Sequence, residues 1–285
     1  MSELVSPFEI VNHGLMPAKI RVVVFDLDGT LSLIRSGWIE MMCSIFMKEL
    51  RPLDTQLSDA DLQTFSEETI LKLTGKETIY QMAALADAVR SRGGTPLSAS
   101  EYKDVFLGQL MEKVAANLRS IETDAQRQDN FLVPGARALL EHLTDLGVTL
   151  YLASGTDEES VHRETAALDI AKYFGDRIYG ARTDNKGFTK SALVSHLIHE
   201  LKHDPLELLG FGDGFVEINE ISKIGGIAVG VATREPECVE VDPGKRRHLI
   251  AAGADFIIPN YLEQSRFLPL VIRDSFSGAA GRNGF

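Results

Sequence analysis

The sequence is poor in cysteine, in positive charge and in long apolar runs. Its 285 residues include only two cysteines, Cys43 and Cys238, which argues against a disulfide framework and a cysteine-based zinc site. With 29 Lys and Arg against 41 Asp and Glu, the formal net charge is −12, so the chain lacks the excess of cations that attracts nucleic acids and anionic lipids. No run of about 18 uncharged apolar residues occurs, and the N-terminus lacks a signal-peptide pattern. We therefore expect a cytoplasmic protein that binds neither nucleic acid nor membrane.

Short apolar stretches alternate with stretches of helical period over much of the chain. The hydrophobic share of 44% and the charged share of 25% are those of a globular protein. Strands are expected at 20–25, 148–153, 177–179, 208–212, 226–231 and 255–258, and helices between them at 136–146, 158–168, 191–202 and 216–224. This alternation predicts an α/β fold with a doubly wound, mostly parallel sheet.

One long segment interrupts this alternation. Residues 36–131 contain helix-period stretches at 38–50, 59–73, 77–90 and 101–119 and no convincing strand. We therefore predict an inserted all-helical domain, which we expect to cover the strand ends where open α/β sheets bind ligands. The predicted domains are an N-terminal extension (1–19), a core (20–35 and 132–270), the helical insert (36–131) and a flexible tail (271–285).

Two carboxylates follow the first predicted core strand directly. Asp26 and Asp28 are two residues apart and precede Gly29 and Thr30. Carboxylates this close repel each other unless a cation or a proton offsets the charge, so the pair predicts either a divalent metal site or an acid/base pair. Gly29 and Thr30 are expected to offer backbone N–H groups and a hydroxyl to an anion.

The longer string Val-Phe-Asp-Leu-Asp-Gly-Thr-Leu at 24–31 resembles the first motif of the haloacid dehalogenase superfamily of phosphotransferases. The other motifs of that superfamily have counterparts in the same order, namely the strand ending in Ser154-Gly155, the lysine Lys190 with Lys186 as the alternative, and the acids Asp213 and Glu217. Glu217 stands where the superfamily more often has Asp. The resemblance spans residues 21 to 262 and favours the phosphoglycolate phosphatase and β-phosphoglucomutase branch, with a Rossmann-like core and a helical cap of the C1 type.

The resemblance implies a role for each matched residue. It makes Asp26 the nucleophile that forms an aspartyl-phosphate and Asp28 the general acid and base. It gives Ser154, the Gly155 backbone N–H and Lys190 to the phosphoryl oxygens. Mg²⁺ suits the oxygen ligands implied here. These are the carboxylates of Asp26 and Asp213, the backbone carbonyl of Asp28 and waters, with Glu217 holding a metal-bound water.

The second Asp of the motif bears on the reaction. Within the superfamily, Asp28 indicates an alkoxide leaving group that needs a proton, and so a Mg²⁺-dependent phosphomonoester hydrolase acting on a small phosphorylated metabolite. Arg35 and Lys76 are candidates for contacting that metabolite, although both are equally explained as solvated side chains. The related mutases carry a His where Trp38 stands here, which favours hydrolysis. A phosphomutase and a catalytically silent binding protein remain the alternatives, and the chain is expected to be a monomer or a homodimer.

Overall fold

The computed structural model describes residues 8–73, 78–181, 192, 196 and 204–273. The chain divides into two compact units, one formed by Met1–Ile34 with Ile121–Phe285 and the other by Arg35–Ser120. Among the described residues, no helix combines the length and the apolar character needed to cross a lipid bilayer.

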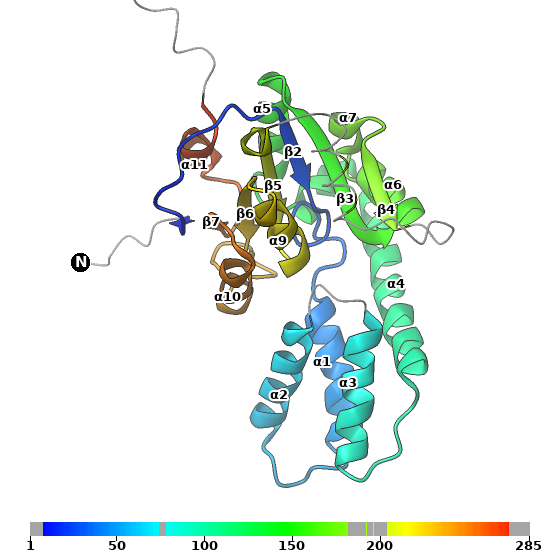
Figure 1. Ribbon diagram of the computed structural model, residues 1–285. Helices are drawn as coiled ribbons and strands as arrows, with labels where there is room; N and C mark the ends of the chain where they lie inside the picture. The colour runs from blue at the N-terminus through cyan, green and yellow to red at the C-terminus, as the bar shows by residue number, and fades with distance from the viewer. Residues whose placement is uncertain (1–7, 74–77, 182–191, 193–195, 197–203, 274–285) are drawn as a thin grey trace, which may run out of the picture. The chain divides into compact units, whose positions relative to one another are not determined.

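The first unit contains a seven-stranded sheet in the order β1-β7-β6-β5-β2-β3-β4. Its strands are β1 (Glu9–Ile10), β2 (Val22–Phe25), β3 (Thr149–Asp157), β4 (Ile178–Ala181), β5 (Leu208–Gly212), β6 (Ile227–Val231) and β7 (Phe256–Ile258). All neighbouring strands pair in parallel except β1, which is antiparallel to β7. Strand β2 lies between β5 and β3 (Figure 1), and all four of its residues are buried, as expected for a central parallel strand. The predicted α/β, doubly wound parallel fold is confirmed.

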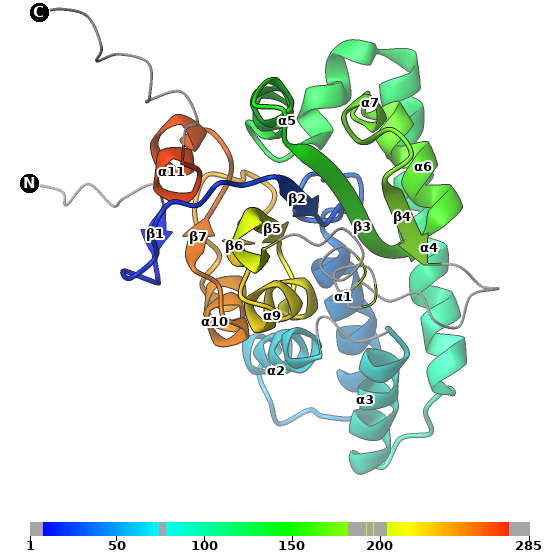
Figure 2. The ribbon, with the colours of Figure 1, turned by 45° about the horizontal axis from the view of Figure 1, so that its top comes forward.

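Helices cover both faces of this sheet (Figure 2). They are α5 (Ala136–Asp145), α6 (Glu158–Ala167), α7 (Ala171–Phe174), α9 (Phe215–Lys223), α10 (Pro243–Ala252) and α11 (Gln264–Val271). Short 3₁₀ helices precede α5, at Ala125–Phe131, and β5, at Pro205–Glu207. Side chains alternate along β2, so Val22 and Val24 join the apolar cluster that includes Ile218 of α9 and Leu249 of α10.

The opposite face of the sheet has an aromatic core. The rings of Phe25 and Phe211, at the ends of neighbouring strands, are stacked with centroids 4.8 Å apart. Phe25 also meets the edge of Phe174 in α7, and Phe211 meets Phe267 in α11. Because these rings are fully or almost fully buried, they fix the end of β2 against β5, and the residues that follow each strand are positioned by the same packing.

The second unit is helical. It contains α1 (Trp38–Leu50), α2 (Asp59–Lys72), α3 (Thr78–Ser91) and most of α4 (Ala99–Thr123), whose last turn belongs to the first unit. Helix α2 begins at the N-cap Ser58, whose hydroxyl accepts a hydrogen bond from the Asp61 N–H at 3.1 Å. Helix α1 buries one face, which includes Met42 and Phe46, and it packs against α2 and α3.

The structure differs from the sequence predictions at both ends of the first unit. Residues 9 and 10, within the predicted N-terminal extension, form β1 and pair with Ile257 and Phe256. At the other end, Val271 ends α11 and Ile272 is buried, so the chain is packed two residues into the predicted tail. The tail residues 274–285 lie outside the described residues, as does most of the helix predicted at 191–202.

Candidate active site

The candidate site lies where three adjacent parallel strands end. Strand β2 is followed by Asp26 and Asp28, strand β5 by Asp213 and Glu217, and Ser154 lies in the last part of β3. Parallel strands have their carboxyl ends at the same edge of a sheet, and ligands of open α/β sheets bind there. A backbone hydrogen bond from the Asp26 N–H to the Phe211 carbonyl, 3.0 Å long, extends the β2–β5 pairing into the site.

The loop after β2 is a tight turn built around Leu27. The buried Leu27 carbonyl accepts hydrogen bonds from the N–H groups of Leu31 and Ser32, at 2.9 and 2.8 Å. Gly29 has a φ of 70°, and a Cβ at that position would lie 2.2 Å from Asp213 Oδ2. Glycine is therefore required both by the backbone conformation and by the close approach of this loop to Asp213.

A buried tyrosine, Tyr261, also holds this loop in place. Tyr261 is fully buried and donates a hydrogen bond of 2.9 Å from its hydroxyl to the Thr30 carbonyl. Burial raises the pKa of Tyr261 well above its ordinary value, and the negative charges of Asp213 and Asp26 add to this shift. The hydroxyl therefore stays protonated and remains a donor to the loop.

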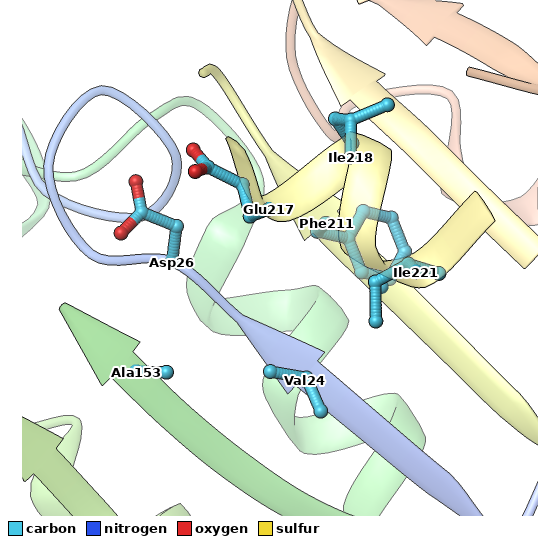
Figure 3. Close-up of a pocket in the computed structure, with 8 residues that line it drawn as sticks. Val24, Asp26, Ala153, Phe211, Glu217, Ile218 and Ile221 are labelled. Carbon is cyan, nitrogen blue, oxygen red and sulfur yellow. The ribbon is translucent and has the colours of Figure 1, made fainter. Parts of the chain in front are cut away.

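Three carboxylates converge at the centre of the site. Asp26, Asp213 and Glu217 each offer an oxygen, and these oxygens all lie within 4.8 Å of one another. Figure 3 shows the carboxylates of Asp26, just after β2, and Glu217, in α9, extending to the same side of the site. Glu217 is held in place by the Gly214 N–H, which donates to its Oε1 at 2.8 Å. We call these three residues the carboxylate cluster.

The carboxylate cluster fits a divalent cation of the Mg²⁺ type. Opposite ligands of an octahedral Mg²⁺ ion are about 4.2 Å apart, which is comparable with the spread of the cluster. All the ligand atoms are oxygens, and Mg²⁺ prefers oxygen. Three carboxylates this close also repel one another, and a divalent cation removes that repulsion.

The second carboxylate of the loop, Asp28, is held by strand β3. The Thr156 hydroxyl donates a hydrogen bond of 2.9 Å to Asp28 Oδ2, and the Ser154 hydroxyl lies 3.5 Å from the same oxygen. Ser154 Oγ in turn accepts from the Thr156 N–H at 3.1 Å. The sequence analysis singled out Ser154 but missed Thr156, although Thr156 makes the shorter contact with Asp28.

A small cavity lies under the cluster and does not serve as a substrate pocket. It measures about 10 Å³ and is lined by apolar groups of β2, β3, β5 and α9 together with Asp26 and Glu217 (Figure 3). This volume holds at most one water molecule. Substrate must therefore approach the carboxylates from elsewhere.

Lys245 is a second residue that the sequence analysis missed. Its Nζ lies 3.0 Å from Asp213 Oδ2 and 3.4 Å from Glu235 Oε1. Burial disfavours the ammonium, but the carboxylates of Asp213 and Glu235 outweigh it and raise the pKa of Lys245 above its ordinary value. Lys245 stands in the first turn of α10, where the N-cap Asp242 accepts its backbone N–H at 2.7 Å. The pair Asp242-Pro243 is a helix-start signal, so the sequence did contain a clue to this helix.

The family model of haloacid dehalogenase-like hydrolases matches residues 20–225 of the sequence. The chain belongs to the haloacid dehalogenase-like hydrolase family. The resemblance inferred from the four motifs is therefore confirmed. No curated protein matches the sequence.

Solved structures of haloacid dehalogenase-like proteins share this fold. A predicted phosphoglycolate phosphatase from Haemophilus somnus matches with a TM-score of 0.57 and 17% identity over 87% of this chain and 97% of its own. A hydrolase from Deinococcus radiodurans with bound phosphate and sodium matches with a TM-score of 0.55 and 16% identity over 90% and 100% of the two chains. A putative β-phosphoglucomutase from Thermotoga maritima matches with a TM-score of 0.53 and 17% identity over 86% and 98%.

In this haloacid dehalogenase-like hydrolase, two of the expected phosphate contacts are taken up by the loop itself. The Gly29 N–H donates to the Ser32 carbonyl at 2.9 Å, and the Thr30 N–H donates to the Leu27 carbonyl at 3.3 Å. The Thr30 side chain is fully buried. Both backbone N–H groups are thus engaged in the tight turn that positions the two aspartates, and phosphate binding by Gly29 and Thr30 stays a prediction.

Other expected site residues have different outcomes. Lys76, Lys186 and Lys190 lie outside the described residues, so the identity of the motif lysine stays a prediction. Gly155 is exposed beside the buried Ser154 in the last part of β3, and its contact with phosphate stays a prediction. Arg35 is the first residue of the helical unit, and its contact with a substrate stays a prediction.

Proposed function

We propose that this family member is a Mg²⁺-dependent phosphomonoester hydrolase that acts on a small phosphorylated metabolite. The observation that carries the proposal is the carboxylate cluster, whose oxygens lie within 4.8 Å of one another, together with Asp28 held beside it by Thr156. A phosphate monoester is already anionic near neutral pH, so an anionic nucleophile requires neutralisation of the combined charge. A cluster of carboxylates that can bind a divalent cation is suited to the hydrolysis of a phosphate monoester.

In the first step, a carboxylate oxygen of Asp26 attacks phosphorus and the ester P–O bond breaks, which leaves an aspartyl-phosphate. Asp28 in its acid form gives its proton to the departing oxygen, and an alcohol leaves. In the second step, Asp28 as carboxylate takes a proton from a water molecule as that water attacks phosphorus. The bond between phosphorus and Asp26 then breaks, releasing inorganic phosphate and restoring both aspartates.

The carboxylates of Asp26 and Asp213 and the backbone carbonyl of Asp28 would hold Mg²⁺, and Glu217 would orient one of its waters. The bound ion supplies positive charge that offsets the phosphoryl group and the nucleophile. In our assignment, Ser154, whose hydroxyl lies 3.5 Å from Asp28 Oδ2, donates a hydrogen bond to a phosphoryl oxygen, and the Gly155 N–H and the motif lysine bind the same phosphoryl group.

The leaving group is assigned to an alcohol of a small metabolite because Asp28 is present to protonate it. We assign substrate selection to the helical unit, Arg35–Ser120, in which Arg35 and Lys76 are the candidate contacts. Two structural neighbours support a phosphate ester as substrate, since one is described as a predicted phosphoglycolate phosphatase and another was solved with phosphate bound.

Phosphate release from a panel of phosphorylated metabolites tests the proposal. Release is expected with Mg²⁺ and not with EDTA, and Asp26→Asn is expected to abolish it. Asp28→Asn should lower kcat by about 10²- to 10⁴-fold, the usual contribution of a general acid. Asp87→Asn, on the exposed face of α3, is the matched control and should retain wild-type activity.

Two outcomes would overturn the proposal. If ³¹P NMR shows an isomerised sugar phosphate forming before free phosphate, the protein is a phosphomutase; Trp38, in place of the mutase histidine, argues against this. If no substrate is turned over and Asp26→Asn behaves as the wild type does in every assay, the protein is a silent member of the family.

A further inference from the structure

The ion pairs of Lys245 are not used by any step of the proposed reaction. The side chains of Lys245, Asp213 and Glu235 are only 11%, 19% and 14% exposed. Removing an ion pair from water costs about as much as the pairing returns, and apolar side chains of similar volume often stabilise a fold equally well. The arrangement of Lys245, Asp213 and Glu235 is therefore better explained by its effect on the position of the Asp213 carboxylate than by its effect on the stability of the fold.

Asp213 Oδ2 is enclosed on two sides. The Lys245 ammonium lies 3.0 Å from it, and the Gly29 backbone comes so close that a Cβ there would lie 2.2 Å from the same oxygen. Lys245 is itself restrained at both ends, because Asp242 caps its backbone N–H and Glu235 contacts its Nζ. With Oδ2 committed to the ammonium, Asp213 offers a cation its other oxygen alone.

The number of oxygens that a carboxylate offers separates Mg²⁺ from Ca²⁺. Mg²⁺ requires near-octahedral geometry with ligands at about 2.0 to 2.1 Å, whereas Ca²⁺ takes about six to eight oxygens at 2.3 to 2.6 Å and readily accepts both oxygens of one carboxylate. A carboxylate restricted to one oxygen therefore penalises Ca²⁺ more than Mg²⁺.

We propose that Lys245, held by Glu235, is a positioning residue that restricts Asp213 to a single-oxygen ligand and thereby gives the site its preference for Mg²⁺ over Ca²⁺. The proposal rests on the metal site of the proposed function. Lys245 contacts neither substrate nor the reacting atoms in this role, and it acts through Asp213.

Isothermal titration of the full-length protein with MgCl₂ and with CaCl₂, without substrate, tests this proposal. The preference is measured as the dissociation constant for Ca²⁺ divided by that for Mg²⁺. Lys245→Met is expected to lower this ratio by about tenfold, which corresponds to the loss of one charge-assisted hydrogen bond. Lys245→Arg keeps a donor for Asp213 and should largely restore the ratio. Lys223→Met, which removes an exposed lysine at the end of α9, is the matched control and should leave the ratio unchanged.

The outcomes separate this proposal from the proposed function. If Lys245→Met strengthens binding of both ions by the same factor, Lys245 contributes only charge and the proposal is wrong. If Lys245→Met does not fold, Glu235→Gln removes the group that restrains Lys245, and an unchanged ratio in that variant overturns the proposal. If the wild type binds neither ion, and Asp213→Asn changes nothing, the metal site of the proposed function fails as well.

Discussion

The hydrogen bond between Thr156 and Asp28 leads to the most specific prediction about the chemistry. Thr156 Oγ1 donates to Asp28 Oδ2 at 2.9 Å. An oxygen that accepts this bond is the poorer site for a proton, so the acid form of Asp28 carries its proton on the other oxygen, and the carboxyl group is held in one orientation. Thr156→Val keeps the size of the side chain but removes the hydroxyl.

The size of the effect follows from the kind of bond that is lost. A hydrogen bond to a charged group contributes about 1.5 to 3 kcal/mol, which corresponds to a fall of about 10- to 150-fold in kcat/KM if it is made fully in the transition state. The loss should depend on the leaving group. An alkyl phosphate needs protonation by Asp28, whereas p-nitrophenolate leaves without much help, so its hydrolysis should fall far less.

The assay compares kcat/KM of both substrates in the wild type and the variant. Thr156→Ser retains the hydroxyl and should recover most of the activity toward the alkyl phosphate. Thr64→Val makes the same substitution on α2, where the hydroxyl donates to the Ala60 carbonyl of the same helix, and should change the hydrolysis of neither substrate. An equal loss for both substrates, or no loss at all, would refute the assignment of Thr156 as the residue that orients Asp28.

Three further predictions concern stability and reactivity. Gly29→Ala should destabilise the protein and lower its activity, because the position has a φ of 70° and a Cβ there would clash with Asp213 at 2.2 Å; an unchanged melting temperature would contradict this. Burial, with nearby acids adding, raises the pKa of the Cys43 thiol to about 12, so a thiol reagent at neutral pH should label it only after denaturation. The hydrogen bonds from Arg246 lower the pKa of Glu9, so this pair stabilises the fold above the ordinary carboxyl pKa and loses its contribution as pH falls through the lowered value. Since these side chains are 37% and 40% exposed, Glu9→Gln should cost less than about 1 kcal/mol at neutral pH, and urea unfolding of the two proteins should converge in acid.

Much of the sheet could be predicted because its strands are short apolar runs that end at glycine or at a charged residue. β5 has the predicted bounds, Leu208–Gly212, and α1 likewise runs from Trp38 to Leu50 as predicted. β3 does not stop at Ala153. It continues to Asp157 with a shift in its register against β4, and this irregular end brings Thr156 to Asp28. No periodicity in a single segment encodes such a shift, because it arises from the pairing of two strands.

The elements that were missed lack the apolar pattern by which the others could be predicted. β1 is two residues long and exists because it pairs with β7, almost 250 residues away. α10 is largely polar, and of its ten residues Leu249 and Ala252 are the buried ones. It therefore lacks the apolar stripe that is typical of most helices. The local signal for this helix is its start, where the N-cap Asp242 is followed by Pro243.

The charge balance of the site explains why Lys245 belongs with the motif residues although no motif contains it. Asp26, Asp213 and Glu217 place three carboxylates within 4.8 Å, and each additional acid at this edge of the sheet raises the cost of keeping the others ionised. Lys245 offsets part of that charge at one oxygen of Asp213. In the reaction that we propose, a cation and the groups that bind phosphate balance the rest. In the arrangement that we propose, the backbone of Gly29 and the capped start of α10 together decide which oxygen of Asp213 pairs with Lys245 and which is left for a cation.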